Sequence, residues 1–399
     1  MNKLTLADLQ VKGKRVLVRV DYNVPLKDGR VAEDSRITAS LPTLRRLLEG
    51  GARVILMSHL GRPKGKPDPK YSLRPVAAHL SGLLGRPVRF AEDCIGAAAV
   101  AMSRELAPGE VLLLENLRFH PQEEANDPGF AAELARLGDL FVNDAFGSAH
   151  RAHASTEGVT RHFAQAAAGV LMEQELHYLG LALAEPARPF VVILGGAKIS
   201  GKIDVLTNLL GKVDRILVGG GMTYTFYRAQ GMEIGNSLVE PDRIDMAREV
   251  LAAGQKAGVE IVLPVDSMVS TAADGSAPVR ATESAAIPSG FLGGDIGPRT
   301  IHLFREKLAD ARTVVWNGPL GIFEVPVYAA GTVEIAQAVA EVAARGGVSV
   351  VGGGDSVAAI AQSGIPDSAY SHVSTGGGAF LEFLEGKILP GVAALTERS

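Results

Sequence analysis

The residues best suited to chemistry are glycine turns in the second half of the chain. Glycine pairs or triplets follow apolar runs at 195–196, 219–221, 352–354 and 376–378, and Asn317-Gly318-Pro319 follows another. Glycine lets the backbone approach a ligand closely, and at the start of a helix the free N–H groups face an anion. Several such turns at neighbouring strand ends predict a cradle for a nucleotide or another phosphate.

One of these turns is accompanied by lysines. The segment 196–202, Gly-Ala-Lys-Ile-Ser-Gly-Lys, nearly matches a P-loop, but Ile203 stands where that motif needs Ser or Thr for magnesium. Lys198 and Lys202 are four residues apart, so we expect them to share a helix face and to hold an anion between them.

Asp355 follows the 352–354 turn and is the candidate ligand for Mg²⁺, although capping of a helix is an alternative role. Neither 219–221 nor 352–354 completes G-x-G-x-x-G, which argues against a dinucleotide site. The turn 376–378 precedes a helical run at 379–384 and offers amides to an anion. Glu324 could accept from ribose hydroxyls, but on its own it is typical of a solvated surface residue.

The first half carries cations where the second half carries glycine. Predicted strand ends are followed by Asp21 and Asn23, His59 and Arg62, Arg118, and the segment 144–153, and Arg36 lies beside the start of a helix. Arginine offers a rigid fork for carboxylate or phosphate oxygens, and a cluster of cations is costly unless anions share it. The pattern indicates a small substrate with several negative charges, although each arginine alone could form a surface salt bridge.

The histidines in this half have a less specific meaning. His150 and His153, close to Arg151, have metal-ligand spacing, but no third ligand is evident, so a structural role is favoured over zinc.

Predicted strands and helices, which must position these residues, follow one another in turn along the chain. Short apolar runs that are not interrupted by polar residues at every second position are typical of parallel strands covered on both faces, and stretches with helical periodicity separate them. The expected fold class is therefore α/β, with mainly parallel sheets whose ligands bind beyond the carboxyl ends of the strands. The expected strands are 15–20, 54–58, 111–114, 140–143, 190–194, 215–218, 260–263, 313–316 and 348–351.

The length of 399 residues favours two domains. The seam is predicted at 172–189, because 172–184 is helical and Glu185-Pro186-Ala187-Arg188-Pro189 ends it. This places a first domain at 1–171, a second at 190–384, and a terminal segment at 385–399.

Composition excludes several classes of function. A net charge of −4 gives no basic field for nucleic acid or membrane, and no apolar run is long enough to span a bilayer. Because Cys94 is the only cysteine and the N-terminus lacks a signal-peptide pattern, we expect a cytoplasmic protein without disulfides.

Taken together, the motifs resemble those of the phosphoglycerate kinase family, in the family's order and over nearly the whole chain. They are the segments 19–25, 58–63, 115–119, 143–147, 150–153, 195–198, 316–319, 352–355 and 374–379. Three positions depart from the family pattern: Tyr22 stands where Phe is common, Gly201 where Asp is frequent, and Phe380 where Ser is usual.

The resemblance implies Mg²⁺-dependent reversible phosphoryl transfer between 1,3-bisphosphoglycerate and ADP, giving 3-phosphoglycerate and ATP, in a monomer with hinge-bending closure. It implies that the glycerate phosphate is held by Asp21, Asn23, Arg36, His59, Arg62, Arg118 and Arg151. It places the nucleotide and Mg²⁺ on Lys198, Lys202, Gly219, Gly220, Gly293, Asn317, Pro319, Glu324, Gly352, Gly353, Gly354, Asp355 and Ser356, with Asp355 as the metal ligand. It also implies two doubly wound, mainly parallel-sheet domains that face a central cleft and are joined by a helix, and it implies that the last residues of the chain pack on the first domain.

The transferring phosphoryl group needs positive charge on its oxygens rather than a general base. The expected catalytic groups are Arg36, Lys198 and the amides of Gly376 and Gly377. Three other functions are weighed against this one. Another two-domain phosphate kinase would not explain the arginine set, an anion-binding protein would not need Lys198 or Asp355, and a dehydrogenase would need the dinucleotide motif.

Overall fold

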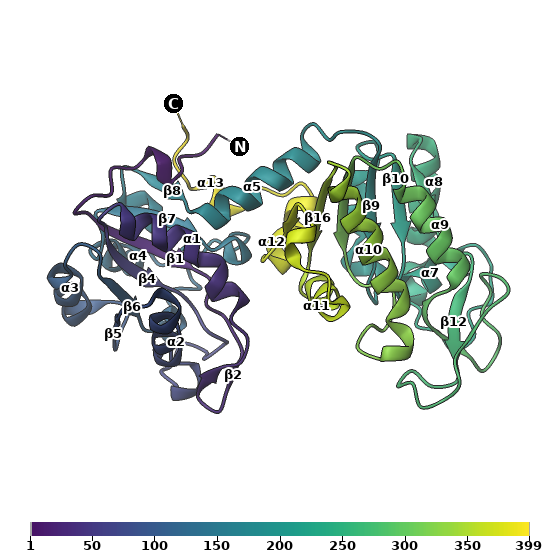
Figure 1. Cartoon of the computed structure of the whole chain (residues 1–399), viewed down its shortest axis with the longest axis horizontal. Coiled ribbons are helices and arrows are strands. Elements are labelled where there is room, and N and C mark those ends of the chain that lie inside the picture. Colours follow the sequence, from purple (N-terminus) through teal and green to yellow (C-terminus); the bar gives the residue numbers. More distant parts are fainter. Residues whose placement is uncertain (1, 399) are drawn as a thin grey trace. The chain divides into compact units, whose positions relative to one another are not determined.

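The computed structural model describes residues 2–398, which form two compact units (Figure 1). The first comprises the residues up to His177 together with those from Ile388 onward, and the second is Tyr178–Lys387. The boundary falls inside helix α5 (Val170–Leu183) and again after Lys387. Met1 and Ser399, which belong to the predicted segments 1–171 and 385–399, lie outside the described residues.

The first unit is built on a six-stranded sheet with the order β5-β6-β4-β1-β7-β8, in which all the paired strands are parallel. Residues 16–20 of β1 are buried, as a strand covered on both faces requires. The strands are β1 (Arg15–Val20), β4 (Arg53–Met57), β5 (Val88–Ala91), β6 (Val111–Leu114), β7 (Leu140–Asp144) and β8 (Ala166–Ala168).

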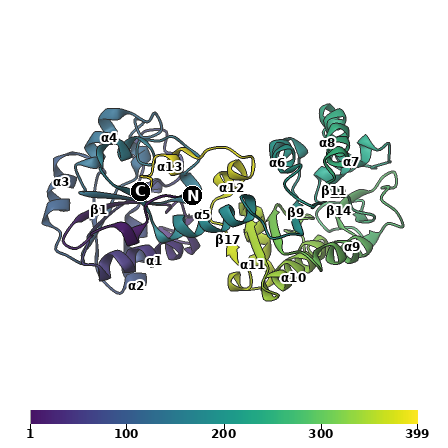
Figure 2. The ribbon, with the colours of Figure 1, turned by 90° about the horizontal axis from the view of Figure 1, so that it is seen from above.

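Helices cover both faces of this sheet, and a short hairpin of β2 (Leu26–Lys27) and β3 (Arg30–Val31) precedes the first of them (Figure 2). The chain ends lie side by side, because Lys3 forms an antiparallel bridge with Glu397 and Leu4 N–H donates to the Thr396 carbonyl at 2.9 Å. The helices are α1 (Ser35–Glu49), α2 (Arg74–Leu84), α3 (Gly96–Glu105), α4 (Pro128–Ala135) and α13 (Pro390–Ala393).

The second unit has a parallel sheet with the order β11-β10-β9-β15-β16-β17. The chain adds strands on one side of β9, then crosses to the other side to add β15. The switch point between β9 and β15 is where ligands bind in doubly wound sheets. The strands are β9 (Phe190–Leu194), β10 (Arg215–Val218), β11 (Glu260–Val262), β15 (Thr313–Asn317), β16 (Val348–Gly352) and β17 (His372–Val373).

Helices again lie on both faces of the sheet (Figure 2). They are α6 (Ile203–Leu209), α7 (Met222–Ala229), α8 (Ile244–Ala257), α9 (Pro298–Leu308), α10 (Ala330–Ala344), α11 (Gly354–Ser363) and α12 (Gly377–Leu384). An antiparallel sheet of β13 (Arg280–Ala281), β12 (Ser267–Ser270) and β14 (Leu292–Ile296) was not expected from the sequence.

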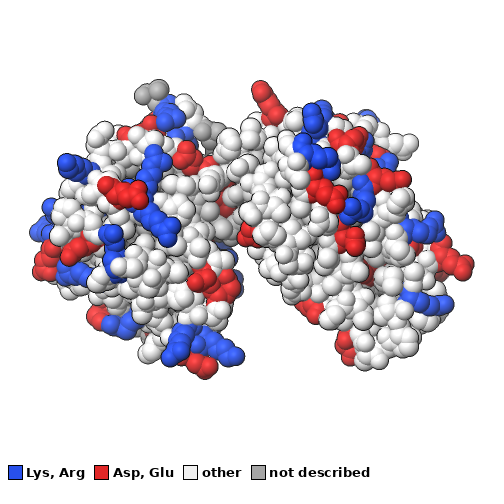
Figure 3. All heavy atoms as spheres, viewed as in Figure 1, with Lys and Arg blue, Asp and Glu red and all other residues white. Residues whose placement is uncertain are grey.

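The α/β class with two parallel sheets is confirmed. Among residues 2–398, no helix is both long and apolar enough to cross a bilayer. Basic and acidic side chains are interspersed on the face shown in Figure 3, so neither unit presents a field of one sign there.

Candidate functional site

The first unit gathers its predicted site residues at one edge of the sheet. Strands β6, β4, β1 and β7 are consecutive neighbours and parallel, so their carboxyl ends meet. Asp21 and Asn23 follow β1, His59 follows β4, Arg118 follows β6, and Arg151 follows β7. We call this group, with Arg36 and Arg62, the arginine cluster.

Arg36 lies in the first turn of α1 and is anchored to the loop after β1. Its Nη1 lies 3.2 Å from Asp21 Oδ2 and donates to the Asn23 carbonyl at 3.3 Å. Asn23 Oδ1 in turn accepts from Gly61 N–H at 2.9 Å, which ties the loops after β1 and β4 together. The side chain of Arg36 remains 34% exposed, so part of its guanidinium faces solvent while its position is fixed.

His59 is buried beside a buried arginine. Arg19 Nη2 donates to His59 Nδ1 at 3.0 Å, so Nδ1 is the acceptor and the ring proton lies on Nε2. Burial, followed by the positive charges of Arg19 and Arg118, holds the pKa of His59 well below its usual value. His59 is therefore neutral at pH 7 and carries its one ring proton on Nε2.

Glu123 is the buried counterion of this group. It accepts from Ser155 N–H at 2.9 Å and from Ser155 Oγ at 2.6 Å, and Ser155 Oγ also accepts from Arg19 Nε at 2.8 Å. Burial raises the pKa of Glu123, although the charge of Arg19 opposes that shift. His153 lies 3.9 Å away, and burial with Arg118 nearby lowers its pKa to about 4, so it is also neutral at pH 7.

Of the three remaining arginines, two leave positive charge uncompensated. Arg118 is 5% exposed and donates to the Gly61 carbonyl at 2.9 Å, and its Nε is 3.3 Å from an oxygen of the exposed Glu124. Arg62 and Arg151 have no ion pair with any residue of the described range. Since each anion already has a cation partner, the arginine cluster suits a ligand that brings several negative charges.

The second unit has a pocket of about 230 Å³ at the switch point of its sheet. Loops after β9, β15 and β16 and the starts of α11 and α12 form its walls. Its lining includes Lys198, Lys202, Asn317, Pro319, Gly353, Gly354, Asp355, Ser356 and Gly377.

Hydrogen bonds connect the loops that line this pocket. Asn317 is buried, its Nδ2 donates to the Gly352 carbonyl at 2.8 Å, and its Oδ1 accepts from Lys202 Nζ. Ser356 Oγ joins the same two loops, because it accepts from Gly318 N–H at 2.6 Å and donates to the Gly352 carbonyl at 2.9 Å. Only glycine fits at Gly353, which has a φ of +100° and where a Cβ would lie 2.5 Å from Asn317 Nδ2.

Lys198 and Lys202 both line the pocket, but the prediction that they share a helix face was wrong. They lie on either side of a short 3-10 turn, Ile199–Gly201, and α6 begins only at Ile203. Glu240 accepts from Ser200 N–H and Oγ, and this contact together with Gly201 favours the turn over an α-helix. Burial lowers the pKa of Lys202 to about 8.

The glycine turn 376–378 is only partly available to a ligand. Gly376 N–H donates to Ser374 Oγ at 3.2 Å, whereas Gly377 begins α12 and lines the pocket. Phe380 is fully buried, and a Cβ at Gly352 would lie 2.5 Å from its Cδ2. Its ring therefore packs against the backbone, and a hydrogen bond from this position to phosphate is lost.

Asp355 fits a role toward a magnesium nucleotide. It lies in the first turn of α11, it is exposed, and it lines the pocket with the two lysines; the N-cap position belongs to Gly353. Mg²⁺ in such sites takes one or two carboxylates and otherwise binds water and substrate phosphates, so one carboxylate in this place is sufficient.

Comparisons with known proteins decide the family. The family model described as phosphoglycerate kinase matches residues 6–387. The chain belongs to the phosphoglycerate kinase family. The phosphoglycerate kinase of Chloroflexus aggregans is 57% identical over 400 residues, and that of Chloroherpeton thalassium is 56% identical over 396 residues. These alignments cover 100% and 99% of this chain, respectively, and 100% of each relative.

Solved structures of the family have the same fold. The phosphoglycerate kinase of Coxiella burnetii aligns with a TM-score of 0.89 at 42% identity, and that of Pyrococcus horikoshii with 0.85 at 35%. Each alignment covers 98% of both chains. A phosphoglycerate kinase is a phosphotransferase with a carboxyl group as acceptor, so the dehydrogenase and simple binding-protein alternatives are set aside.

Five residues predicted to bind the nucleotide lie outside the lining of the pocket. Gly219 N–H donates to the Leu194 carbonyl and Gly220 N–H to the Leu320 carbonyl, each at 2.9 Å, so these amides serve the loops. Gly293 lies in β14 against the Tyr224 hydroxyl, Gly352 ends β16 under Phe380, and Glu324 is exposed. The prediction that these five residues bind the nucleotide substrate of a phosphoglycerate kinase remains a prediction.

Sequence reasoning missed the buried residues behind the arginine cluster. Arg19 stands between two valines in the buried part of β1, and that anomaly was an available signal because buried arginine needs partners. Asn116, whose Nδ2 donates to the Leu60 and Tyr71 carbonyls, lay in a motif but was given no role. Glu123 and Ser155 had no signal, because they are loop residues whose contact depends on the tertiary fold.

Proposed function

We propose that this chain catalyses the Mg²⁺-dependent, reversible transfer of a phosphoryl group between 1,3-bisphosphoglycerate and ADP, giving 3-phosphoglycerate and ATP, the ATP-forming step of glycolysis. The observation that supports this proposal most is the presence of two different anion sites on two units. One is a cluster of arginines suited to a small acid with several charges, and the other is a glycine-lined pocket with two lysines and one exposed carboxylate.

In this proposal the arginine cluster binds the glycerate. Arg62 and Arg151, which have no ion pair within residues 2–398, provide charge to the ligand without breaking an internal contact. The Nε2–H of the neutral His59 adds a directional donor, and Asp21 and Asn23 hold Arg36 where it faces the reacting phosphate.

Transfer breaks the bond between phosphorus and the acyl oxygen and forms one between phosphorus and a terminal β-phosphate oxygen of ADP. The carboxylate leaves with the bonding electron pair, so no proton has to move and no general base is required. Arg36 from the acid side, with Lys198 and the Gly377 amide from the nucleotide side, neutralises the charge on the transferring oxygens. Since Gly376 N–H is engaged with Ser374, its role requires that this bond be released.

Asp355 is the residue that would hold Mg²⁺, which supplies charge neutralisation on the nucleotide phosphates. Lys202 is positioned by Asn317 for the same phosphates.

We also propose that the two units close on each other during turnover, since neither site contains both reactants. Closure would exclude water, which otherwise hydrolyses the acyl phosphate. Small-angle scattering should show a smaller radius of gyration with 3-phosphoglycerate and Mg-ADP together than with either alone. An unchanged radius with both ligands bound would contradict closure.

A coupled assay with 3-phosphoglycerate and Mg-ATP tests the reaction itself. We expect formation of ADP and 1,3-bisphosphoglycerate, and no turnover when glycerate replaces 3-phosphoglycerate or when EDTA removes Mg²⁺. ADP formation that does not depend on 3-phosphoglycerate would contradict the proposal. A cytoplasmic location and a monomeric state remain predictions.

A further inference from the structure

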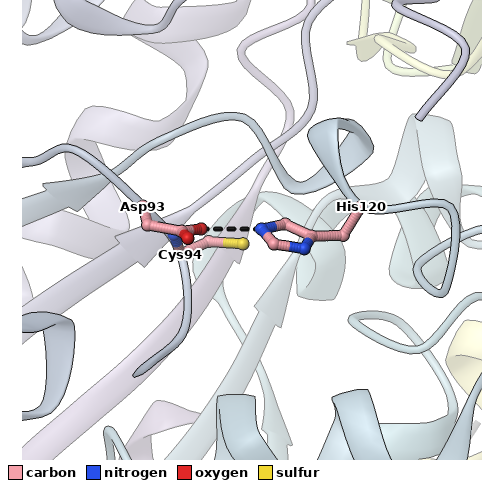
Figure 4. Close-up of side chains that lie close together, drawn as sticks. All are labelled: Asp93, Cys94 and His120. Carbon is pink, nitrogen blue, oxygen red and sulfur yellow. Dashed lines mark hydrogen bonds and ion pairs between the residues drawn. The ribbon is translucent and has the colours of Figure 1, made fainter. Parts of the chain in front are cut away.

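Three chemically active side chains meet at a place that the proposed reaction does not use. Asp93 and Cys94 follow β5, and His120 follows the 3-10 turn Leu117–Phe119 that comes after the neighbouring strand β6. Because β5 and β6 are parallel neighbours, their carboxyl ends bring the two loops together. Figure 4 shows the carboxylate of Asp93 and the sulfur of Cys94 both directed at the imidazole ring of His120.

The ligand atoms of these residues lie close to one another. One carboxylate oxygen of Asp93, the Cys94 Sγ and one ring nitrogen of His120 all lie within 4.8 Å of one another. His120 Nε2 is 2.7 Å from Asp93 Oδ1, and Cys94 N–H donates to the same oxygen at 2.6 Å. The ring of His120 is supported by Phe130, with ring centroids 5.3 Å apart.

The three side chains differ in their access to solvent. Cys94 is fully buried, so its sulfur is a ligand atom that solvent does not reach. The carboxylate of Asp93 attracts a divalent cation, and its side chain, which is 52% exposed, leaves a path from solvent.

We propose that Asp93, Cys94 and His120 form a binding site for a thiophilic divalent cation of the zinc type. One thiolate, one imidazole and one carboxylate are the ligands that Zn²⁺ accepts in tetrahedral sites, with a fourth position left for water. The bond lengths of zinc place tetrahedral donor atoms about 3.5 Å apart, so the 2.7 Å hydrogen bond between Asp93 and His120 must open as the cation enters. Cation binding replaces the S–H bond of Cys94 by a sulfur–metal bond and releases one proton to solvent.

Titration of the whole protein with Co²⁺ tests this site without measuring catalysis. We expect one equivalent to bind with a sulfur-to-cobalt charge-transfer band in the near ultraviolet, and Zn²⁺ to displace it. Cys94→Ser should abolish the band, and His120→Gln should weaken Co²⁺ binding by about tenfold or more. If Cys94→Ser does not fold because the serine hydroxyl is buried, His120→Gln still tests the site.

A matched control is available in the same unit. His79 and Asp34 form a histidine–carboxylate pair at 2.8 Å with similar exposure. Within residues 2–398 this pair does not belong to a cluster of three possible metal ligands. His79→Gln should leave both the band and the affinity unchanged. The proposal is overturned if saturating Co²⁺ produces no thiolate band, if the band survives in Cys94→Ser, or if His79→Gln weakens binding as much as His120→Gln.

Discussion

Two arginines of the first unit are alike in exposure and pairing, but only one of them, Arg36, is a predicted site residue. Arg36 and Arg89 have side chains 34% and 35% exposed, and each pairs with one carboxylate, at 3.2 and 3.1 Å. The difference lies in the surroundings. Asp21, the partner of Arg36, is itself 11% exposed and adjoins the arginine cluster, whereas Glu105, the partner of Arg89, is 63% exposed. Exposure and pairing alone therefore do not identify a functional arginine.

Arg36→Ala should lower kcat by about 10³-fold or more, the range for an arginine that stabilises phosphoryl transfer, and leave the fold intact. Arg89→Ala is the matched control and should change kcat less than twofold, since an exposed ion pair contributes about 0–1 kcal/mol to stability alone. Steady-state assays with thermal melts of both variants make the comparison. Near-normal turnover of Arg36→Ala would remove it from the catalytic groups.

Lys202 should make nucleotide binding at the proposed site depend on pH. With a pKa of about 8 it is charged below pH 8 and becomes neutral above it, and only the charged form attracts phosphate. The affinity for Mg-ADP should therefore be constant between pH 6 and 7.5 and fall above pH 8 by up to about tenfold per pH unit.

Lys202→Arg keeps its charge throughout this range and should show a flat profile by calorimetry. Equal losses of affinity above pH 8 in both proteins would mean that another group titrates.

At the scale of elements, buried aspartates accept hydrogen bonds from backbone N–H groups in the first turns of two long helices. Asp144 Oδ1 accepts from Leu171 N–H at 3.0 Å in the first turn of α5. Asp295 Oδ2 accepts from Gly331 N–H at 2.6 Å in the first turn of α10. Burial nevertheless raises the pKa of each to about 7. The desolvation cost therefore exceeds the gain from the helix N-terminus.

The stability that Asp144 contributes is fully present below its unfolded pKa of 3.8 and is lost as the pH rises through about 7. Asp144→Asn retains an acceptor oxygen and removes this titration. The loss of unfolding free energy between pH 5 and pH 8 should be smaller in this variant by about 1–3 kcal/mol, measured by urea denaturation.

Asp127→Asn provides the control, because Asp127 accepts from Phe130 N–H at 2.8 Å at the start of α4 but is only half-buried. It should keep the pH dependence of the parent protein. A parent protein that loses no stability relative to Asp144→Asn over this range would contradict the raised pKa.

The sequence predicts elements well where one local signal dominates. Apolar runs such as those of β1 and β15 indicate parallel strands because both faces are covered. Strands β12 and β14 contain serine, glycine and aspartate, so they lack that signal and form only through pairing with each other. The turn at 199–201 was missed for the same reason, because the contact with Glu240 is distant in sequence.

For the site, strand ends and glycine turns could be located from the sequence, but the network behind them could not. Glu123 lies 104 residues from Arg19, the difference of their positions, and no local pattern links the two. Which glycine amides are free is also a tertiary property. Gly377 lines the pocket, while Gly376 N–H is bound by Ser374.

At the scale of the whole molecule, each unit carries one of the two proposed anion sites. Arg151 belongs to the first unit and Asp355 to the second, and neither has an ion pair within residues 2–398. Substitution of either residue should therefore weaken the binding of one ligand without leaving a charged residue of the protein unpaired. The central claim is that the acid and the nucleotide are bound by separate units and meet only for transfer.

Calorimetric titration of Arg151→Ala and Asp355→Ala with 3-phosphoglycerate and with Mg-ADP tests this claim most directly. We predict that Arg151→Ala weakens 3-phosphoglycerate binding by about tenfold or more, as loss of a charged hydrogen bond implies, and leaves Mg-ADP binding within about twofold. Asp355→Ala should do the reverse. If either variant weakens both ligands equally, the assignment of one reactant to each unit is wrong.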